Sequence, residues 1–269
     1  MISGKADMKS VELYWWATKP NFGDLIGPWL VEMMTGRKAI NVKDDKTKGG
    51  VATVGSILQS LNRPGLDVWG SGVLYRLSAD KVQRLTRRKP RAIHALRGWH
   101  TYSEVKKKLG WKAPRIFGDP ALLLPRYHTI RKTDKAGSPV VVPHYSHKKY
   151  FKGFEGIHVV DVQQDAPTVV NEIGSASCCV STSLHGVIVA HSYGVPWVWL
   201  NIAEQGLKGG NFKFEDFFTV MNRDAVSAVT IEPGSITPSN MLALSNLASL
   251  PKNKFSFDSL NDSFPADFR

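Results

Sequence analysis

The fold class is decided by one stretch of sequence, Cys178-Cys-Val-Ser-Thr-Ser-Leu-His-Gly186, which continues as Val187-Ile-Val-Ala-His-Ser-Tyr-Gly-Val-Pro-Trp-Val-Trp-Leu200. The apolar residues at its start predict a buried strand that ends at Val180. A helix is expected over Val187–Tyr193, ended by the following glycine, with a second strand over Pro196–Leu200. A strand, a hydroxyl-rich turn and a helix in this order are typical of an α/β fold.

A histidine lies in the turn of this stretch. His185 follows Ser181, Thr182 and Ser183 and precedes the predicted helix, whose N-terminal N–H groups favour anions. It therefore fits a proton donor for an anionic substrate. A buried structural histidine, capped by its serine and threonine neighbours, fits the same residues, so this stretch alone leaves both interpretations open.

The rest of the chain repeats the alternation of apolar strand-like runs and amphipathic helix-like runs, which favours an α/β fold with mostly parallel sheets. Further strands are expected at 11–17, 50–54, 67–69, 92–96, 115–117, 140–142 and 156–160. Further helices are expected at 25–35, 101–109, 166–176 and 239–250. A basic, loop-like connector near residues 125–138 separates two series, so we expect domains at 1–135 and 136–269, the second with a C-terminal helix and tail.

Glycines follow the predicted strands of the first series, at Gly55, Gly70, Gly98 and Gly118. Ligands of open α/β sheets bind at the carboxyl ends of strands, where glycine permits a close backbone approach, so a ligand crevice is expected there. None of these turns forms G-x-G-x-x-G or a Walker loop, which argues against a nicotinamide or P-loop nucleotide site. The histidines lack metal-ligand spacing and the cysteine pair has no second pair, so no metal is expected.

Composition limits the class of protein further. The chain has 269 residues, of which 42% are hydrophobic and 22% charged, as in an ordinary globular protein. No apolar stretch reaches the roughly 18–20 residues of a membrane span, and the first residues lack the apolar core of a signal peptide. The adjacent Cys178 and Cys179 are unsuited to an ordinary disulfide with each other. We therefore expect a soluble cytoplasmic protein.

The formal net charge of +12 is concentrated between residues 81 and 115, where Glu104 is the only acid. The cations of this basic run are Lys81, Arg84, Arg87, Arg88, Lys89, Arg91, Arg97, Lys106, Lys107, Lys108, Lys112 and Arg115. Such a run fits an anionic substrate, an anionic membrane surface or nucleic acid, and the chain has no zinc-finger, RRM or KH motif for the last. A solvated face is the commonest interpretation, and peripheral contact with the membrane's inner face is the second.

Motifs along most of the chain together resemble the polysaccharide pyruvyl transferase family, especially its exopolysaccharide ketal-pyruvate branch. They are Asn21-Phe-Gly-Asp24 with Gly27-Pro-Trp-Leu30; Leu96-Arg-Gly98; Leu109-Gly110 and Gly118-Asp-Pro-Ala-Leu-Leu-Leu-Pro125; Pro143-His144; Ser181-Thr-Ser-Leu-His-Gly186; and Lys213-Phe-Glu-Asp-Phe217. Each motif is modest alone. Their order and spacing form the specific signal.

The resemblance implies two Rossmann-like domains facing a central cleft, as in GT-B glycosyltransferases, with the acceptor bound by the first domain and the donor by the second. It implies pyruvyl transfer from phosphoenolpyruvate, as co-substrate and without a cofactor, to two hydroxyls of a sugar in a surface polysaccharide or its lipid-linked precursor. His185 is then the general acid and Arg97 binds the donor's anionic groups. The remaining expected substrate-binding residues are Asn21, Asp24, Gly118, Asp119, His144, Ser181, Thr182, Ser183 and Leu184.

Three of these residues have a structural alternative. Asp24 stands where a helix N-cap would, and Asp119 fits a turn cap better than a base. His144 follows a predicted strand end on the expected ligand side, which leaves both a ligand role and a structural role open. One position departs from the family pattern, because many members have arginine immediately before the Leu-His pair and this chain has Ser183. Loss of a charge-assisted contact weakens anion binding by about 1.5–3 kcal/mol, so another cation is required, with Lys148, Lys208 or the basic run as candidates.

Two other functions fit the same fold. A glycosyltransferase using a nucleotide sugar would bind a diphosphate near Ser181–Gly186 and would grip a ribose through a residue such as Glu204. A non-catalytic protein that binds glycans or a membrane surface would depend on the basic run and not on His185.

Overall fold

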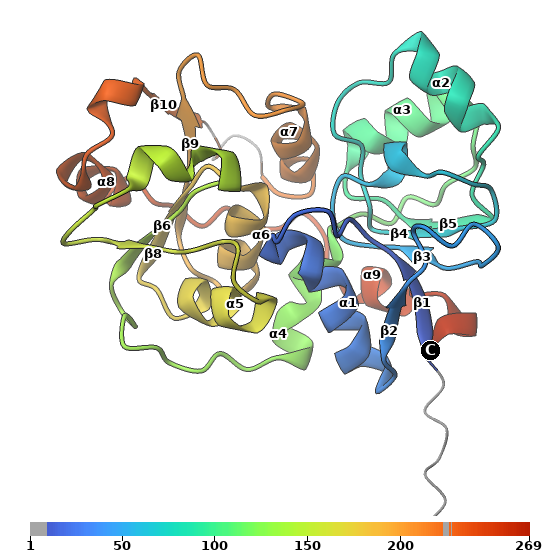
Figure 1. Cartoon of the computed structure of the whole chain (residues 1–269), viewed down its shortest axis with the longest axis horizontal. Helices are drawn as coiled ribbons and strands as arrows, with labels where there is room; N and C mark the ends of the chain where they lie inside the picture. The colour runs from blue at the N-terminus through green and yellow to red at the C-terminus, as the bar shows by residue number, and fades with distance from the viewer. Residues whose placement is uncertain (1–9, 223–225, 227) are drawn as a thin grey trace, which may run out of the picture.

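The computed structural model describes residues 10–222, 226 and 228–269, and arranges them in two lobes, each built on a five-stranded sheet (Figure 1). The N-terminal lobe contains β1 (Val11–Tyr14), β2 (Ala39–Asn41), β3 (Val51–Ala52), β4 (Asp67–Trp69) and β5 (Ala92–Ala95). The C-terminal lobe contains β6 (Pro139–Val142), β7 (His158–Val159), β8 (Cys178–Ser181), β9 (Trp197–Ile202) and β10 (Ala228–Ile231).

Both sheets have the same topology. The strand order is β2-β1-β3-β4-β5 in the first sheet and β7-β6-β8-β9-β10 in the second, and all of these strand pairs are parallel. The prediction of an α/β fold with parallel sheets is therefore confirmed. In such doubly wound sheets a crevice opens at the carboxyl ends of the two strands where the order reverses, here between β1 and β3 and between β6 and β8.

The helices connect these strands and join the lobes. They are α1 (Phe22–Thr35), α2 (Ala79–Thr86), α3 (Trp99–Leu109), α4 (Leu124–Tyr127), α5 (Ala166–Gly174), α6 (Leu184–Ser192), α7 (Phe212–Phe218), α8 (Pro238–Ser245) and α9 (Asp258–Asp262). Helix α8 covers one face of the second sheet, and α5 and α6 cover the other (Figure 1). Across the lobes, α1 packs on α5 and α3 packs on α7. None of the helices in the described part of the chain is long and apolar enough to cross a membrane.

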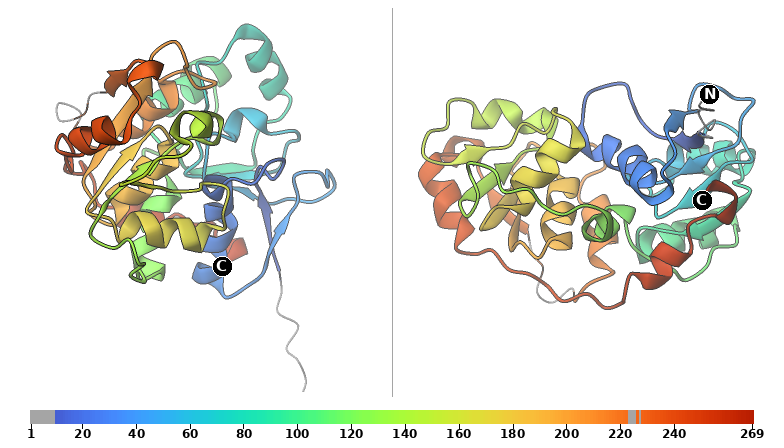
Figure 2. Two further views of the ribbon diagram at one scale, coloured as in Figure 1. Left: turned by 60° about the vertical axis from the view of Figure 1, so that its left-hand side comes forward. Right: turned by 90° about the horizontal axis from the view of Figure 1, so that it is seen from below.

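The C-terminal segment returns to the first lobe, along one side of the molecule (Figure 2). Nε1 of Trp69, on β4, donates to the carbonyl of Leu260 at 2.9 Å, and its ring packs edge-to-face on Phe264. Residues 258–269 thus cover the first sheet, although the boundary predicted at 135/136 assigns them to the second domain. The physical reason is that this segment buries apolar surface and bonds the Trp69 indole.

Several predicted elements differ from the structure. The predicted strand 115–117 is reduced to one bridge between Leu96 and Phe117. Six elements were not predicted: α2, which is dominated by charge, and α4, α7, α9, β2 and β10, which are short. Helix α6 begins at Leu184 instead of Val187, so His185 belongs to the first helical turn and not to the preceding loop.

Candidate active site

Segments that follow the carboxyl ends of strands in the two sheets meet between the lobes, around His185. From the N-terminal lobe come the start of α1, which follows β1, and Gly55, which follows β3. From the C-terminal lobe come His144, which follows β6, and the turn from β8 into α6. His185 joins the two sides, since a Cβ on Gly23 would lie 2.2 Å from its Nδ1 and a Cβ on Gly55 would lie 4.0 Å from its Cε1.

The hydroxyls before α6 hold the turn itself. The Oγ of Ser181 donates to the carbonyl of Val142 at 2.8 Å and accepts from the Ser183 amide at 3.0 Å. The Oγ of Ser183 is the helix N-cap and accepts from the Gly186 amide. All three hydroxyl residues and Leu184 are buried. The structure shows that the hydroxyls of Ser181 and Ser183 form hydrogen bonds with the backbone of the turn. The contact of these residues with substrate stays a prediction.

Thr182 connects this turn to the segment after β6. Its Oγ1 accepts from the amide of His144 at 2.8 Å and lies 3.1 Å from Nδ1 of His147. Nδ1 of His144 accepts from the Ser146 amide, so His144 caps the short 3-10 helix that follows. Burial and the charge of Lys213 lower the pKa of His144 to about 3, so its imidazole is neutral at pH 7. The structure therefore brings His144 beside the α6 turn, as its strand-end position predicts.

The His185 ring is enclosed between the lobes. Its side chain is 13% exposed, and Phe22 contacts it edge-to-face with ring centroids 6.4 Å apart. Its Nε2 lies 3.8 Å from Oδ2 of Asp119, too far for a hydrogen bond and close enough for an ion pair when the imidazole is protonated. Both of these atoms are buried and lack a hydrogen-bond partner among the described residues. Unpartnered buried polar atoms are uncommon, and this pair marks a place where a ligand would complete the bonding.

Asp119 has two functions in this geometry. Its Oδ1 accepts from the amide of Ala121 at 3.0 Å and caps the turn, which confirms the structural interpretation of this residue. Its Oδ2 is the atom that faces His185. The preceding Gly118 has a φ of 139°, and a Cβ there would lie 2.8 Å from Leu260, so this glycine is required for packing against the C-terminal segment.

Asn21 and Asp24 lie at the start of α1. Asn21 occupies the N-cap position, and its Nδ2 donates to Oδ2 of Asp24 at 2.8 Å. The N-cap interpretation of Asp24 is therefore wrong, because the helix begins at Phe22 and places Asp24 inside its first turn. Burial raises the pKa of Asp24, whereas the charges of His185 and Lys213 lower it. The Asp24 carboxyl is thus electrostatically coupled to both.

Arg97 joins the two lobes. Its side chain is fully buried, and its Nε donates to Oδ2 of Asp216, on α7, at 2.9 Å. Its other nitrogens donate to Oγ of Ser56 and to the carbonyl of Val73. Asp216 also accepts from the amide and the hydroxyl of Thr101 at 2.7 Å each, which satisfies the N-terminus of α3. In this structure, the guanidinium is occupied by protein groups, and its predicted contact with the donor stays a prediction.

The motif of residues 213–217 was noted in the sequence as part of the family resemblance, without a role for any of its residues. In the structure, its Asp216 makes this contact between the lobes, and its Lys213 is one further site residue. Lys213 is 8% exposed, and its charge acts on Asp24, His144 and His147. Lys213 was not predicted from the sequence as a site residue. The available signal was a single cation in the otherwise apolar and aromatic start of α7, Phe212-Lys-Phe214.

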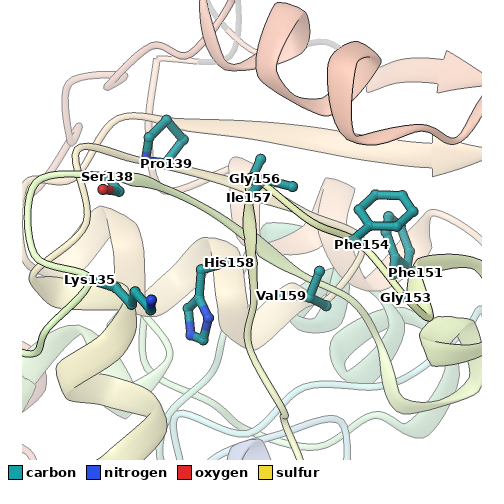
Figure 3. Close-up of a pocket in the computed structure, with 10 residues that line it drawn as sticks. All are labelled: Lys135, Ser138, Pro139, Phe151, Gly153, Phe154, Gly156, Ile157, His158 and Val159. Atoms are coloured by element: carbon teal, nitrogen blue, oxygen red, sulfur yellow. The ribbon is translucent and has the colours of Figure 1, made fainter.

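A cavity of about 680 Å³ lies elsewhere in the C-terminal lobe, along the edge strand β7 (Figure 3). Its lining includes Pro139, the first residue of β6, together with Phe151, Phe154 and His158. This cavity is therefore at the amino ends of the strands, the end opposite to the crevice that holds His185. Because α/β sheets bind ligands at their carboxyl ends, the inter-lobe site is the candidate active site.

The fold and the site define an α/β protein with a buried histidine between two lobes, and comparison with known proteins gives its class. The family described as polysaccharide pyruvyl transferase matches residues 59–204, more than half of the chain. The chain belongs to the polysaccharide pyruvyl transferase family and is an enzyme of this type.

Two curated relatives extend the match beyond that segment. The uncharacterized protein L143 of Acanthamoeba polyphaga mimivirus is 25% identical over 234 residues, which is 81% of this chain and 77% of that protein. The succinoglycan biosynthesis protein ExoV of Rhizobium meliloti (strain 1021) is 28% identical over 222 residues, 76% of this chain. This alignment covers 62% of ExoV, so the chain spans less than two thirds of that relative.

Proposed function

We propose that this protein transfers the pyruvyl group of phosphoenolpyruvate to two hydroxyls of a sugar, forming a cyclic ketal and releasing phosphate. The sugar belongs to a surface polysaccharide or to its lipid-linked precursor. The donor binds on the α6 side of the site, and the acceptor binds beside Asn21 and Asp24. His185 carries the proposal, because its imidazole is buried between the lobes with Nε2 unpartnered among the described residues.

The reaction needs one proton transfer to carbon. The His185 imidazolium donates a proton to the methylene carbon of phosphoenolpyruvate, which becomes a methyl group. The second carbon forms bonds to two sugar oxygens, and its bond to the phosphate oxygen breaks. The two hydroxyl protons are released, and one of them restores the imidazolium while the other leaves on phosphate. Atoms and charges balance without a redox step.

The surroundings of His185 suit that role. The Asp119 carboxylate, at 3.8 Å, balances the positive charge of an imidazolium, and the N–H groups at the start of α6 face a departing anion. Asp24 lies on the opposite lobe, hydrogen-bonded to Asn21, where it accepts a proton from an attacking hydroxyl. Closure of the lobes around these groups excludes water, which strengthens each electrostatic contact.

The test is a reaction in D2O with phosphoenolpyruvate and oligosaccharide or lipid-linked acceptors, followed by phosphate release and NMR of the product. The ketal methyl group is expected to carry one deuterium, delivered from solvent through the histidine. His185→Gln is expected to lower turnover at least 100-fold. His158→Gln, a histidine on the far edge strand, is the matched control and is expected to keep full activity. A His185→Gln variant as active as the control contradicts the proposed role.

The rival glycosyltransferase function has a separate prediction. Glu204, its candidate ribose-binding residue, is exposed at the end of β9. Thermal stabilisation by phosphoenolpyruvate, at about 2.7 kcal/mol for a ligand at 100 times its dissociation constant, is expected for the pyruvyl transferase. Stabilisation by nucleotide sugars alone would favour the glycosyltransferase instead.

A lipid-linked acceptor would bring the enzyme to a membrane surface. The helices α2 and α3 pack together, and they expose Arg84, Lys106, Lys107 and Lys108. We expect co-sedimentation with phosphatidylglycerol vesicles and not with phosphatidylcholine vesicles. Replacing Arg84, Lys106 and Lys107 with glutamine is expected to abolish it, because each contributes about 1 kcal/mol near an anionic surface, whereas Lys108 is left in place because its amine is paired with Glu104.

A further inference from the structure

Lys213 is a buried cation with no counter-ion in contact. It lies in the first turn of α7, and its side chain is 8% exposed. Within the described residues, its amine forms no ion pair and no hydrogen bond, and it lies over the Phe214 ring, 5.4 Å from the ring centroid. Burying an ammonium without a partner is costly, so such a group is normally paired.

Among the residues that the structure describes, the other buried lysine and arginine side chains are hydrogen-bonded to protein groups. Arg97 bonds Asp216, and Arg63 donates to the carbonyls of Lys48 and Val42. A cation without a protein partner can bind an anionic ligand, which then supplies the missing negative charge. The groups that interact electrostatically with Lys213 indicate where that ligand would lie.

Those neighbours belong to the candidate active site. Burial lowers the pKa of Lys213 to about 8, with Arg97 adding to this effect and Asp24 opposing it. The lysine charge in turn lowers the pKa values of His144 and His147. The Lys213 charge is therefore coupled to groups of both lobes, among them Asp24, whose pKa the His185 charge also lowers. Helix α7, which carries Lys213, belongs to the same lobe as α6, where the donor is proposed to bind.

The turn before α6 contains no cation. Ser183 uses its hydroxyl as the helix cap, and the exposed Lys148 is already bonded to Asp161 and Gln163. The N–H groups of a helix N-terminus alone provide about half a positive charge. Phosphoenolpyruvate brings a carboxylate and a phosphate, so a full positive charge beside that terminus is needed to balance it.

We infer that Lys213 is the cation that binds the anionic end of the donor, in place of a cation at position 183. This inference rests on the proposed function and adds to it a donor-binding residue from the inter-lobe helix. Lys213 contacts the phosphate or the carboxylate of the donor, and the two contacts are distinguished by separate probes.

Isothermal titration of the full chain with phosphoenolpyruvate, inorganic phosphate and pyruvate tests the inference. Lys213→Met keeps the side-chain length and removes the charge, and it is expected to weaken phosphoenolpyruvate binding about 10-fold to 100-fold. Lys252→Met, at an exposed position in the segment after α8, is the control and is expected to bind as the wild type does. Loss of phosphate binding alone assigns the phosphate, and loss of pyruvate binding alone assigns the carboxylate.

Two further measurements separate donor binding from a structural role. The ligand-free Lys213→Met variant is expected to melt no lower than the wild type, since an unpaired buried charge is removed. Donor affinity of the wild type is expected to fall between pH 7 and pH 9, and this dependence is expected to vanish in Lys213→Met. Adding Ser183→Arg to Lys213→Met is expected to restore binding by supplying a cation beside the α6 turn.

The outcomes are distinguishable. If the wild type binds phosphoenolpyruvate and Lys213→Met binds it within twofold, the inference is wrong and the proposed function stands. If the wild type binds no phosphoenolpyruvate, the proposed function fails and the inference fails with it.

Discussion

The contact between Arg97 and Asp216 gives the sharpest prediction about the stability of the protein. Both side chains are fully buried, and they belong to different lobes. The perturbation is Asp216→Ala, which removes the charge facing the Arg97 guanidinium and the acceptor of two bonds from Thr101. Arg97 would remain bonded to Ser56 and Val73, but its charge would be buried without compensation.

The expected cost follows from that residual charge. Removing one partner of a buried ion pair costs about 3–5 kcal/mol, and the loss of an N-terminal helix acceptor costs roughly 1 kcal/mol within that range. For a chain of this size, the melting temperature is expected to fall by about 5–10 °C. Replacing both partners, in Arg97→Met with Asp216→Leu, is expected to recover most of the loss, since apolar replacement of a buried pair is often neutral or stabilising.

Urea denaturation and calorimetry are applied to Asp216→Ala and to a double-mutant cycle of the wild type, Arg97→Met, Asp216→Leu and the variant that carries both changes. A cost below about 1 kcal/mol for Asp216→Ala, or a double variant as unstable as the sum of Arg97→Met and Asp216→Leu, would contradict this account of the buried pair. Donor titration of the double variant also examines the role predicted for Arg97 from the sequence. If the arginine only joins the lobes, that variant keeps the wild-type affinity for phosphoenolpyruvate.

Three other predictions concern single positions. Gly23→Ala is expected to lower kcat about 100-fold, because its Cβ would overlap the His185 ring, while the fold is retained since alanine favours a helix by about 1 kcal/mol. His144 stays neutral in the folded state down to about pH 3, whereas the unfolded chain protonates it near its ordinary pKa of 6.5. Its contribution to stability is therefore complete above pH 6.5 and is lost as the pH falls toward 3, by at most about 1.4 kcal/mol per pH unit. Trp69→Phe removes the donor to the Leu260 carbonyl and is expected to cost about 1–3 kcal/mol in urea unfolding.

Each of these predictions has its own control. Gly234→Ala, where an added Cβ meets no atom within 4 Å, is expected to leave kcat unchanged. His144→Asn keeps a capping side chain and is expected to flatten the stability profile between pH 6.5 and 4, so an unchanged profile contradicts the argument. For Trp69→Phe, increased proteolysis between residues 250 and 258 is expected, and resistance equal to the wild type would show that the indole bond does not hold the C-terminal segment.

Local patterns predicted much of the fold. Strand β4 was predicted with its observed bounds, and β5, β6 and β8 to within one residue, because the apolar runs of β4, β6 and β8 end at a glycine, a proline and a serine, and that of β5 at a charged residue. Helix starts were less accurate, as at Phe22 and Leu184, because a helix N-terminus depends on capping bonds with neighbouring segments. The return of residues 258–269 to the first lobe had no local signal, since it depends on the Trp69 surface of another lobe.

Some features of the candidate site could also be predicted from the sequence, and others could not. The position of His185 at the start of a helix after a buried strand, and the glycines at the strand ends, could be predicted from the sequence because they belong to single βα units. The approach of Gly23 to His185 could not, since these residues are 162 positions apart and meet only when the two sheets face each other. The same holds for the contact of Arg97 with Asp216.

The α/β class, the parallel strands, the family and a histidine between a buried strand and a helix follow from the sequence alone, because hydrophobic periodicity and turn residues act over short distances. Which charges are paired became known only from the folded chain. It bonded Arg97 to Asp216, turned Asp119 toward His185 and left Lys213 buried without a partner. Pairing depends on distances across the lobe interface and on burial from water, and neither is encoded in the spacing of residues along the chain.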